Sequence, residues 1–583
     1  DYGNRVGIPT VAGQVAFHPK YTGNPLVNVG CVGIVEKELM IHSKAGDIGD
    51  IYILAGGRTG RDGIHGVTFA SRDLDAGADE DIGAVQMGDP ITKEPLMHLC
   101  LELNKMKLLT GMKDLGGGGL SCVVGELALD GGFGAMVNLE KVHLKVGNMP
   151  PWEIWVSESQ ERMMFTVTPE NVDKVLARCE AWDVEAVTIG EVISEKRNIV
   201  NYKGIEILNL DLNFTTGGPV YKRPYNLPEY DIGKAAPLPK YPSDISNKII
   251  DIISQPEVAS KDWIIRQYDH EVRGKTVLKP IQGPIGKDVP GDSSVLKPVD
   301  DSWKGLALTS DVNPYLMEAN PYHGTMSAVE EVCRNLASVG ARIDSLADCL
   351  CFGNPRRPDI MGQFRASCEA LKDAATAVDV PYVSGNVSLY NETQDGAIPP
   401  TPVLMGIGLV KDIRKCVTSD MKNEGTIWLV GKTREEMGAS LYYRTLGVSC
   451  PKVPITDFEA FMPRMEQLIQ AIENGEVVAC HDISTGGLAL SIIEMCMSGI
   501  GAKIELTSDL RADIELFSET NGRWVVQVKS GCENDFEKRF DFAVKIGDID
   551  DRMIFTKDGK EISTFEIEKL RNDWISPIWD RLA

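Results

Sequence analysis

Two short segments combine acidic side chains with glycine or hydroxyl groups in patterns that suit ligand chemistry. In "KDLGGGGLSC", Asp114 and one leucine precede four consecutive glycines. In "SESQER", Glu158, Ser159 and Gln160 place a carboxylate, a hydroxyl and an amide side by side. Carboxylate oxygens suit Mg²⁺, and backbone amides at a helix start can hold an anion. Taken singly, each segment also fits a turn with ordinary capping hydrogen bonds.

A strand, a glycine turn and a helix are predicted around Asp114. A short apolar stretch leads up to the aspartate, and Leu120, Val123, Val124 and Leu127 follow at the spacing of one helical face. No Gly-Lys-Ser/Thr follows the glycines, so the segment is not a P-loop. The residues alone leave two alternatives open, a tight turn behind the aspartate and an anion cradle at the helix start.

The sequence repeats itself on either side of a proline-rich segment. "KDLGGGGLSCVVGELALDGG" matches "HDISTGGLALSIIEMCMSGI" from His481, and "SESQERMMFTV" matches "SETNGRWVVQV" from Ser518. Further matched stretches occur in the same order in both halves. Proline cannot sustain a helix or central strand, so residues 217–245 are expected to be a linker. Matches in a fixed order indicate a duplicated fold unit.

The two copies differ in length at their start. The second copy has a full unit, from residue 246 to about 380, before its "SGNVSL", whereas the first begins eight residues before its "PTVAGQV". We therefore expect this sequence to be the C-terminal portion of a longer protein. The missing portion would be another polypeptide, a piece of a processed chain, or simply absent from a fragment.

Composition limits the classes of function. The 583 residues are 43% hydrophobic and 25% charged, which is typical of a globular protein of several domains, and the net charge is −24. A strongly acidic protein is not expected to bind nucleic acid through a general basic surface. No apolar run reaches the ~18 residues of a membrane span, and the start lacks a signal-peptide pattern, so a cytoplasmic protein is expected. The 13 cysteines include no Cys-x-x-Cys pair, which favours ordinary buried thiols.

Three more polar clusters are found, the first in an expected loop and the other two after apolar stretches, where strand ends present ligand sites in α/β folds. They are "RTGRDGIHGVTF", which contains His65, "AVQMGDP", which contains Gln86, and "SGNVSLYNE", which contains Gly385, Asn386 and Ser388. The partner of the first cluster in the second copy, "KTREEMGASL", lacks the histidine. One copy is therefore expected to carry the chemistry and the other a structural role.

Together these motifs resemble a known family. "YGNRVGIPTVAGQV", "TGRDGIHGVTFAS", "QMGDP", "KDLGGGGLS", "SESQERM", "FGNPRRP" and "SGNVSLYNET" are similar, in order along the whole chain, to the synthetase subunit (PurL) of phosphoribosylformylglycinamidine synthase. The resemblance implies an α/β fold of the α+β type. Its tandem duplicated units would be PurM-like, with the ATP-binding fold of aminoimidazole ribonucleotide synthetase. Each unit would contain an N-terminal-type domain with a mixed sheet and a C-terminal-type α/β/α domain.

The resemblance also gives domain boundaries. Residues 1–40 would be the end of the first N-terminal-type domain and residues 41–216 the first C-terminal-type domain. After the linker at 217–245, residues 246–412 and 413–583 would form the second pair.

The implied reaction is the ATP-dependent amidation of formylglycinamide ribonucleotide (FGAR) to formylglycinamidine ribonucleotide (FGAM) through an iminophosphate, in purine biosynthesis. ATP and Mg²⁺ are the implied cofactors. The sequence contains no glycine-flanked nucleophilic cysteine with a downstream His-x-Glu. Ammonia would therefore come from a glutaminase subunit (PurQ-like), assembled with a small bridging subunit (PurS-like) and with any separate N-terminal synthetase segment.

The resemblance assigns roles to individual residues. Asp114 and Asn386 resemble magnesium ligands, and Asp348 and Gly385 resemble ATP-contacting positions. The positions that resemble substrate contacts are Gln86, Glu158, Ser159, Gln160 and Ser388. His65 would either approach the substrate phosphate or stabilise its own loop. The family's catalytic residues would lie upstream of Asp1, so none is named in this chain, and alone it would form an incomplete active centre.

Two departures and two alternatives accompany this assignment. In "LADCLCFGNPRRP", Cys349 and Cys351 stand where the family usually has asparagines. The pseudo-symmetric site of the second copy is similar to a structural nucleotide site. A catalytically silent nucleotide-binding scaffold is one alternative, although Asp114 and the Glu158 triplet are intact. A relative such as aminoimidazole ribonucleotide synthetase is another, but the duplication counts against it.

Overall fold

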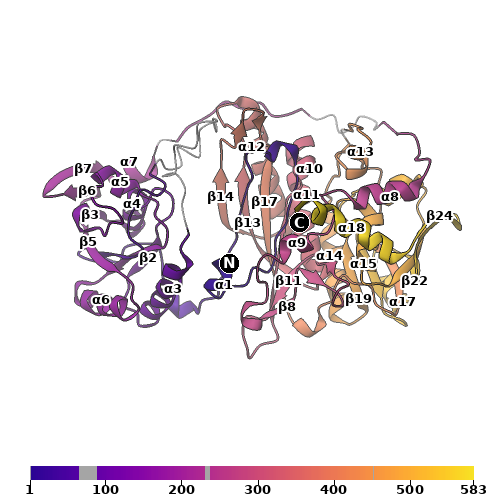
Figure 1. Cartoon of the computed structure of the whole chain (residues 1–583), viewed down its shortest axis with the longest axis horizontal. Helices are drawn as coiled ribbons and strands as arrows, with labels where there is room; N and C mark the ends of the chain where they lie inside the picture. Colours follow the sequence, from indigo (N-terminus) through magenta and orange to yellow (C-terminus); the bar gives the residue numbers. More distant parts are fainter. Residues whose placement is uncertain (1, 65–87, 219, 230–236, 451, 583) are drawn as a thin grey trace. The chain divides into compact units, whose positions relative to one another are not determined.

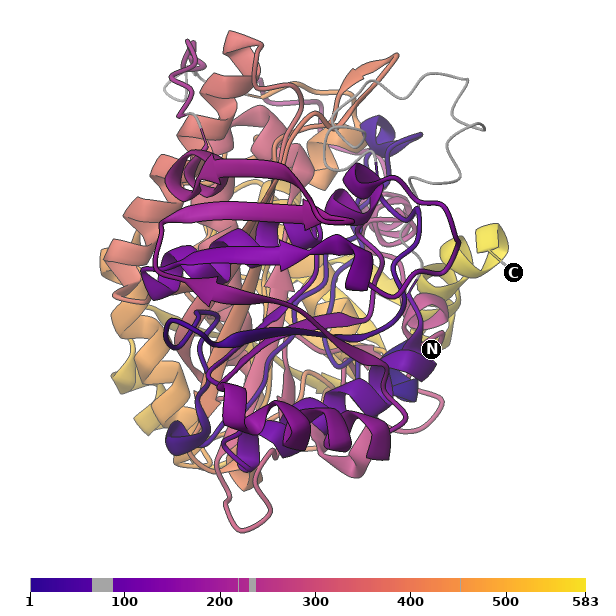
Figure 2. The same cartoon turned by 90° about the vertical axis from the view of Figure 1, so that its left-hand side faces the viewer.

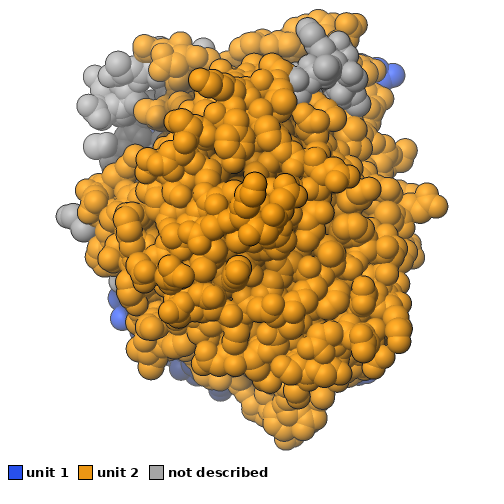
Figure 3. Space-filling model, turned by 90° about the vertical axis from the view of Figure 1, so that its right-hand side faces the viewer, with its two compact units in different colours: residues 1–7, 31–222 blue, residues 8–30, 223–583 orange. Residues whose placement is uncertain are grey.

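The computed structural model divides the chain into two compact units (Figure 1). Unit 1 comprises residues 1–7 and 31–222, and unit 2 comprises residues 8–30 and 223–583; Figure 3 colours them separately. The structure describes residues 2–64, 88–218, 220–229, 237–450 and 452–582. Between α7 (Leu212–Gly217) of unit 1 and α8 (Ile245–Ile253) of unit 2, the described part of the proline-rich segment contains no helix or strand.

Unit 1 is built on a seven-stranded sheet in the order β2-β4-β1-β5-β3-β6-β7 (Figure 2). Its strands are β1 (Ile51–Gly56), β2 (Gly111–Asp114), β3 (Gly134–Asn138), β4 (Arg162–Val167), β5 (Ala186–Ile193), β6 (Arg197–Tyr202) and β7 (Ile205–Asp211). Its described α-helices are α1 (Tyr2–Arg5), α3 (Pro90–Lys105), α4 (Leu120–Gly131), α5 (Pro151–Val156), α6 (Val172–Ala181) and α7 (Leu212–Gly217). Among the strands that the structure describes in this sheet, only β3 and β6 pair in parallel.

Helices cover both faces of this sheet. Along β1, Tyr52 and Leu54 join the core beneath α4 and α7, whereas Ile53 and Ala55 join the core beneath α3 and α6. Successive side chains of a strand point to opposite faces, so a strand buried on both sides reads as a continuous apolar run. The result is an α/β/α layer structure.

Unit 2 contains a second seven-stranded sheet with the corresponding order β19-β21-β18-β22-β20-β23-β24. Its strands are β18 (Thr426–Val430), β19 (Val477–Asp482), β20 (Gly501–Leu506), β21 (Trp524–Val528), β22 (Ala543–Asp550), β23 (Met553–Lys557) and β24 (Lys560–Phe565). Both sheets also contain a register shift at the same place. It lies at Tyr52/Ile53 where β1 pairs with β5, and at Ile427/Trp428 where β18 pairs with β22. The predicted duplication is confirmed strand by strand.

Unit 2 also contains a six-stranded mixed sheet in the order β14-β13-β17-β12-β11-β8. Its strands are β8 (Thr276–Leu278), β11 (Ser294–Leu296), β12 (Gly305–Asp311), β13 (Arg342–Cys351), β14 (Tyr382–Ser388) and β17 (Thr401–Val410). The short strands β9 (Ile281–Gln282), β10 (Val289–Pro290), β15 (Glu392–Thr393) and β16 (Gly396–Ala397) form two small hairpin sheets. The strand β14 forms one edge of the larger sheet and pairs in parallel with β13.

Eleven described α-helices surround the two sheets of unit 2. They are α8 (Ile245–Ile253), α9 (Asp262–Ile265), α10 (Pro314–Ala319), α11 (Pro321–Ser338), α12 (Pro358–Val378), α13 (Leu441–Thr445), α14 (Phe458–Glu473), α15 (Gly487–Cys496), α16 (Ala512–Phe517), α17 (Glu533–Arg539) and α18 (Ile567–Leu582). A continuous core joins α11, α12 and α14 to strands of both sheets. The prediction of tandem mixed-sheet and α/β/α domains is confirmed for the fold class.

Residues 8–30 lie in unit 2 and form no strand. The backbone N–H of Thr10 donates to the carbonyl of Asp269 (2.9 Å), and the Tyr21 hydroxyl contacts the Thr401 hydroxyl at 2.8 Å.

Within the described ranges, no helix is both long and apolar enough to cross a membrane.

Candidate functional site

Asp114 is the last residue of β2, and its side chain is exposed. After the glycine turn, α4 begins at Leu120 and buries the predicted apolar face, with Leu120, Val124 and Leu127 fully buried. The predicted strand, turn and helix are confirmed here. The structure therefore presents a carboxylate at a strand end beside a helix start.

The glycine turn packs against the loop that carries the Glu158 triplet. Gly119 has a φ of +53°, and a Cβ there would lie 1.8 Å from the carbonyl oxygen of Ser157, so only glycine fits. The N–H of Gly118 donates to the Glu158 carboxylate at 2.8 Å. This amide is thus already bound to a side chain of the protein, which favours the close-turn alternative over a phosphate cradle.

A buried arginine holds the triplet loop in place. Arg162 donates from Nε to the carbonyl of Ser159 (2.7 Å), from one terminal nitrogen to the carbonyl of Ser157 (2.6 Å), and from the other to the Thr59 hydroxyl (2.9 Å). Burial lowers the pKa of Arg162 to about 10, so the guanidinium stays charged at neutral pH. Its two bonds to carbonyl oxygens fix the backbone on both sides of Glu158, and the third ties the arginine to Thr59.

The three side chains of the triplet have different contacts. Ser159 is fully buried, and its oxygen accepts from the N–H of Gly60 at 2.8 Å. Glu158 is 4% exposed, and Gln160, which is partly exposed, donates from its amide to the carbonyl of Glu158 at 2.8 Å. Ser159 therefore anchors the loop from inside.

The second repeat contains the same framework. Arg523 donates to the carbonyls of Thr520 (2.9 Å) and Ser518 (2.6 Å) and to the Thr433 hydroxyl (2.9 Å), as Arg162 does in the first repeat. Glu519 accepts from the N–H of Gly486 at 2.9 Å, as Glu158 accepts from Gly118. Contacts present in both repeats are therefore features of the fold.

A second group of predicted site residues lies on β13 and β14 in unit 2. In the parallel register Asp348 is the partner of Gly385, and Cys349 is the partner of Asn386. A Cβ at Gly385 would lie 3.1 Å from the Asp348 carboxylate, so the glycine makes room for that carboxylate. Burial raises the pKa of Asp348. Asp348, Gly385 and Asn386 are thus brought together on neighbouring strands.

The two cysteines that replace the family's asparagines lie against this group. The Asn386 amide donates to Cys349 Sγ at 3.2 Å, and the Sγ atoms of Cys349 and Cys351 are 3.8 Å apart. Ser388 lies at the end of β14, where its hydroxyl accepts from the Asn391 amide at 3.2 Å. Cys349 therefore contacts a predicted metal ligand directly, and Cys351 lies beside Cys349.

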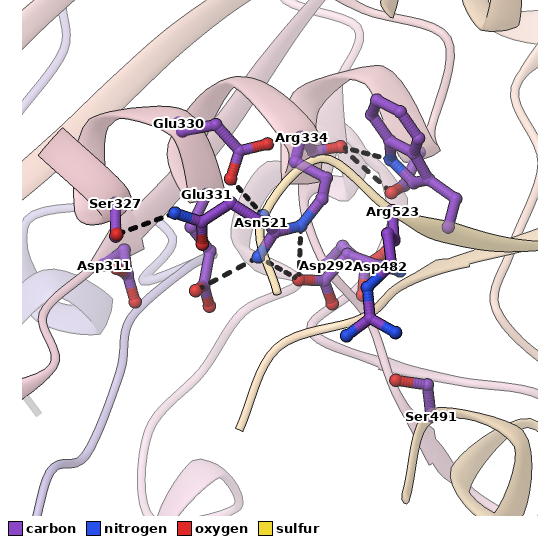
Figure 4. A network of polar contacts seen from close by, with 12 residues as sticks. Asp292, Asp311, Ser327, Glu330, Glu331, Arg334, Asp482, Ser491, Asn521 and Arg523 are labelled. Carbon is purple, nitrogen blue, oxygen red and sulfur yellow. Dashed lines mark hydrogen bonds and ion pairs between the residues drawn. The ribbon is translucent and has the colours of Figure 1, made fainter. Parts of the chain in front are cut away.

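The counterpart of Asp114 in the second repeat has very different surroundings. Asp482 ends β19 as Asp114 ends β2, but it is buried and lies 3.1 Å from the guanidinium of Arg334 (Figure 4). Arg334 of α11 also pairs with Glu330 and, at 3.2 Å, with Glu331. The strand-end carboxylate is therefore exposed in one repeat and enclosed in an ionic network in the other.

Carboxylates outnumber cations in this network. His481 lies 2.6 Å from Asp292 and 3.1 Å from Glu494, and these two carboxylates raise its pKa although burial opposes the change. Asp311 has one buried carboxylate oxygen without a hydrogen-bond partner. Burial and the charge of Asp482 raise the pKa of Asp311 to about 7, against the opposing effects of Gln14 and Arg334. The cluster therefore holds excess negative charge or extra protons.

The predicted site residues fall into two groups. Asp114, Glu158, Ser159 and Gln160 lie together in unit 1, and Asp348, Gly385, Asn386 and Ser388 lie together in unit 2. His65 and Gln86 lie outside the described residues.

Sequence reasoning missed Asp62 and the acidic cluster of the second repeat. Asp62 lies inside the quoted "TGRDGIHG" motif, so the motif itself was an available signal. The cluster's Asp292 lies in the loop between β10 and β11, Asp311 in β12 and Glu331 in α11, and no local pattern links them.

Comparisons with known proteins agree with this architecture. The family model described as the C-terminal domain of AIR synthase related proteins matches residues 47–203 and 422–556. The corresponding N-terminal domain model matches residues 1–35 and 290–410. Both models match twice, as the duplicated sheets require. The class of protein is therefore the AIR synthase related fold in tandem.

Individual relatives define the family further. Phosphoribosylformylglycinamidine synthase subunit PurL of Thermoplasma volcanium is 39% identical over 98% of this chain and 76% of the relative. The same subunit of Thermococcus sibiricus is 40% identical over 98% of this chain and 79% of the relative. The chain belongs to the PurL family of phosphoribosylformylglycinamidine synthase subunits, the ligases that form an amidine in purine biosynthesis.

Solved structures are similar over most of the chain. Thermotoga maritima PurL complexed with FGAR has a TM-score of 0.71 and 26% identity, and the match covers 94% of this chain and 79% of that chain. The structure of PurLQS from Thermotoga maritima has a TM-score of 0.68 and 25% identity, over 97% of this chain and 79% of that chain.

Proposed function

We propose that this chain catalyses the ATP-dependent amidation of FGAR to FGAM, with ammonia supplied by a glutaminase partner. The chemistry transfers a phosphoryl group from ATP to the formamide oxygen, and ammonia then displaces the phosphate from the iminophosphate. Thermotoga maritima PurL complexed with ATP and with FGAR supports both ligands for this chain. The PurLQS complex supports partner subunits, for which PurQ-like and PurS-like proteins are our candidates.

One observation carries this proposal at the level of residues. The two repeats have the same strand order and the same turn, yet Asp114 is exposed whereas its counterpart Asp482 is buried and paired with Arg334. An exposed carboxylate at a strand end can accept a ligand, and one that is enclosed by a guanidinium is already bound. This asymmetry favours the Asp114 end of the first repeat as part of the substrate-converting site. The corresponding Asp482 end of the second repeat would then belong to the structural nucleotide site.

Asp114 in unit 1 and Asn386 in unit 2 would each serve as a Mg²⁺ ligand. A carboxylate and an amide oxygen are the donor types that Mg²⁺ prefers, and the Asn386 amide nitrogen already donates to Cys349, which leaves its oxygen as the ligand atom. When bound, Mg²⁺ neutralises phosphate charge and orients the triphosphate. Asp348 and Gly385 would contact ATP.

The remaining residues would position FGAR. Glu158, Ser159 and Gln160 would do so through the loop that Arg162 fixes, together with Ser388, Gln86 and His65. Positioning of this kind can supply much of the rate enhancement in phosphoryl transfer.

The test is ammonia-dependent ADP release by the full-length gene product. We expect release only when FGAR, Mg²⁺ and ammonium chloride are all present. We expect Asp114→Asn to abolish it, while Asp130→Asn, a matched exchange at the far end of α4, leaves it unchanged. Release that does not need FGAR, or full activity in Asp114→Asn, would refute the proposal.

A further inference from the structure

Asp62 holds the Glu158 triplet through contacts separate from those of Arg162. Its carboxylate accepts from the Ser159 hydroxyl and from Lys145 Nζ, the latter at 2.7 Å. Its backbone carbonyl accepts from the N–H of Glu158 at 2.8 Å. Two successive residues of the triplet are therefore bound to this one aspartate.

The loop that carries Asp62 packs tightly against Glu158. Gly63 has a φ of +61°, and a Cβ there would lie 2.7 Å from the Glu158 Cβ. Burial acts to raise the pKa of Asp62, but the hydrogen bonds from Lys145 and Ser159 outweigh it and hold the pKa below its usual value. Asp62 is therefore a charged acceptor at neutral pH, which fixes the Ser159 hydroxyl as a donor toward it.

The second repeat serves as an internal control for these contacts. Thr59 and Thr433 occupy equivalent places beside the two arginines, so Glu436 is the counterpart of Asp62. There, Thr520 donates to the backbone carbonyl of Arg434 at 3.0 Å and not to the carboxylate of Glu436. Glu436 instead pairs with Arg434 of its own loop at 3.2 Å. The link from a carboxylate to the middle residue of the triplet is thus specific to the first repeat.

We propose that Asp62 is a positioning residue for the substrate site, which acts through Ser159 and the backbone of Glu158. The inference rests on the proposed function, because it takes the triplet to contact FGAR. Contacts common to both repeats stabilise the loop. The contacts of Asp62 with Ser159 and with the backbone of Glu158, here called the Asp62 clamp, are found among the described residues only in the repeat where substrate is proposed to bind. Lys145 keeps the clamp charged, and Asp62 sets the position of Glu158 and Gln160 relative to FGAR.

The experiment compares Asp62→Asn with Glu436→Gln in the full-length gene product, with ammonium chloride as nitrogen source. Each exchange removes one charge from equivalent loops and keeps the side-chain size. We expect Asp62→Asn to raise KM for FGAR by about tenfold or more, because small displacements of positioning groups have effects of this size. KM for ATP should be unchanged. Glu436→Gln should change neither KM.

Further variants separate positioning from folding. Asp62→Glu restores the charge and should recover part of the FGAR affinity, and Asp62→Ala should exceed Asp62→Asn in effect. Urea unfolding of each variant checks that the fold is retained. Equal KM values for FGAR in Asp62→Asn and the parent, or a parallel rise for ATP, would overturn the inference. If the parent itself shows no FGAR-dependent ADP release, the proposed function fails instead.

Discussion

Replacing Asp311 with asparagine should stabilise unit 2 at neutral and alkaline pH. Asp311 is buried at the end of β12, accepts from the Gln14 amide at 3.1 Å, and has one carboxylate oxygen without a partner. Asparagine keeps an oxygen for Gln14 and adds an NH₂ group that can donate to a neighbouring carboxylate. The substitution also removes one negative charge from the acidic cluster around Arg334, in which carboxylates outnumber cations.

The magnitude follows from the pKa of Asp311. Folding raises this pKa from the ordinary aspartate value of 3.8 to about 7. Between these values the folded state keeps a proton that the unfolded state has lost, so stability falls as pH rises from about 4 to about 7. At 1.36 kcal/mol per pKa unit the total loss is about 4 kcal/mol. Asp311→Asn should therefore match the parent near pH 4 and exceed it by up to about 4 kcal/mol at pH 8.

Hydrogen exchange of α11 peptides, measured at several pH values in EDTA, would give the local free energy of opening in both proteins. The difference between the two proteins isolates Asp311 from other titrating groups, including His481, whose raised pKa also makes stability fall with pH. Asp513→Asn is the matched control. This buried aspartate is paired with Arg511 and accepts from the Tyr442 hydroxyl at 2.7 Å. Its replacement by asparagine should therefore destabilise the folded protein at every pH. A pH-independent difference for Asp311→Asn, or a loss of stability at pH 8, would refute the reasoning.

Two further predictions concern the proposed sites. Gly119→Ala should cost more than about 3 kcal/mol in urea unfolding, because its Cβ would lie 1.8 Å from a carbonyl oxygen. Gly132→Ala, at a φ of +84° with open space around it, should cost only about 1 kcal/mol; equal costs would contradict the steric explanation. ATP should slow alkylation of Cys349 by iodoacetamide, followed by mass spectrometry, because this thiol contacts Asn386. Unchanged labelling of Cys349 with ATP would place the nucleotide elsewhere.

The spacing of apolar residues in the sequence predicted the helices and strands well, but it did not predict which charged residues are buried. The spacing of Leu120, Val124 and Leu127 was enough to place α4, because an apolar stripe at helical spacing has one way to be buried. The order of matched motifs predicted the second sheet for the same reason. No such signal marks Asp311 or Glu331, which become neighbours only when β12 and α11 pack together. Charged residues are usually exposed, so sequence alone would have placed the buried Asp311 at the surface.

Comparison of the two repeats distinguishes residues that stabilise the fold from residues that serve the chemistry, which neither repeat would do alone. Arg162 and Arg523 bind the same kinds of acceptor, so the buried guanidinium belongs to the fold and not to a site. Where the repeats differ, a structural requirement of the fold cannot be the cause, because the other repeat folds without the feature. Asp114 and Asp62 are differences of this kind. Their surroundings are therefore where the substrate chemistry of this chain should be sought.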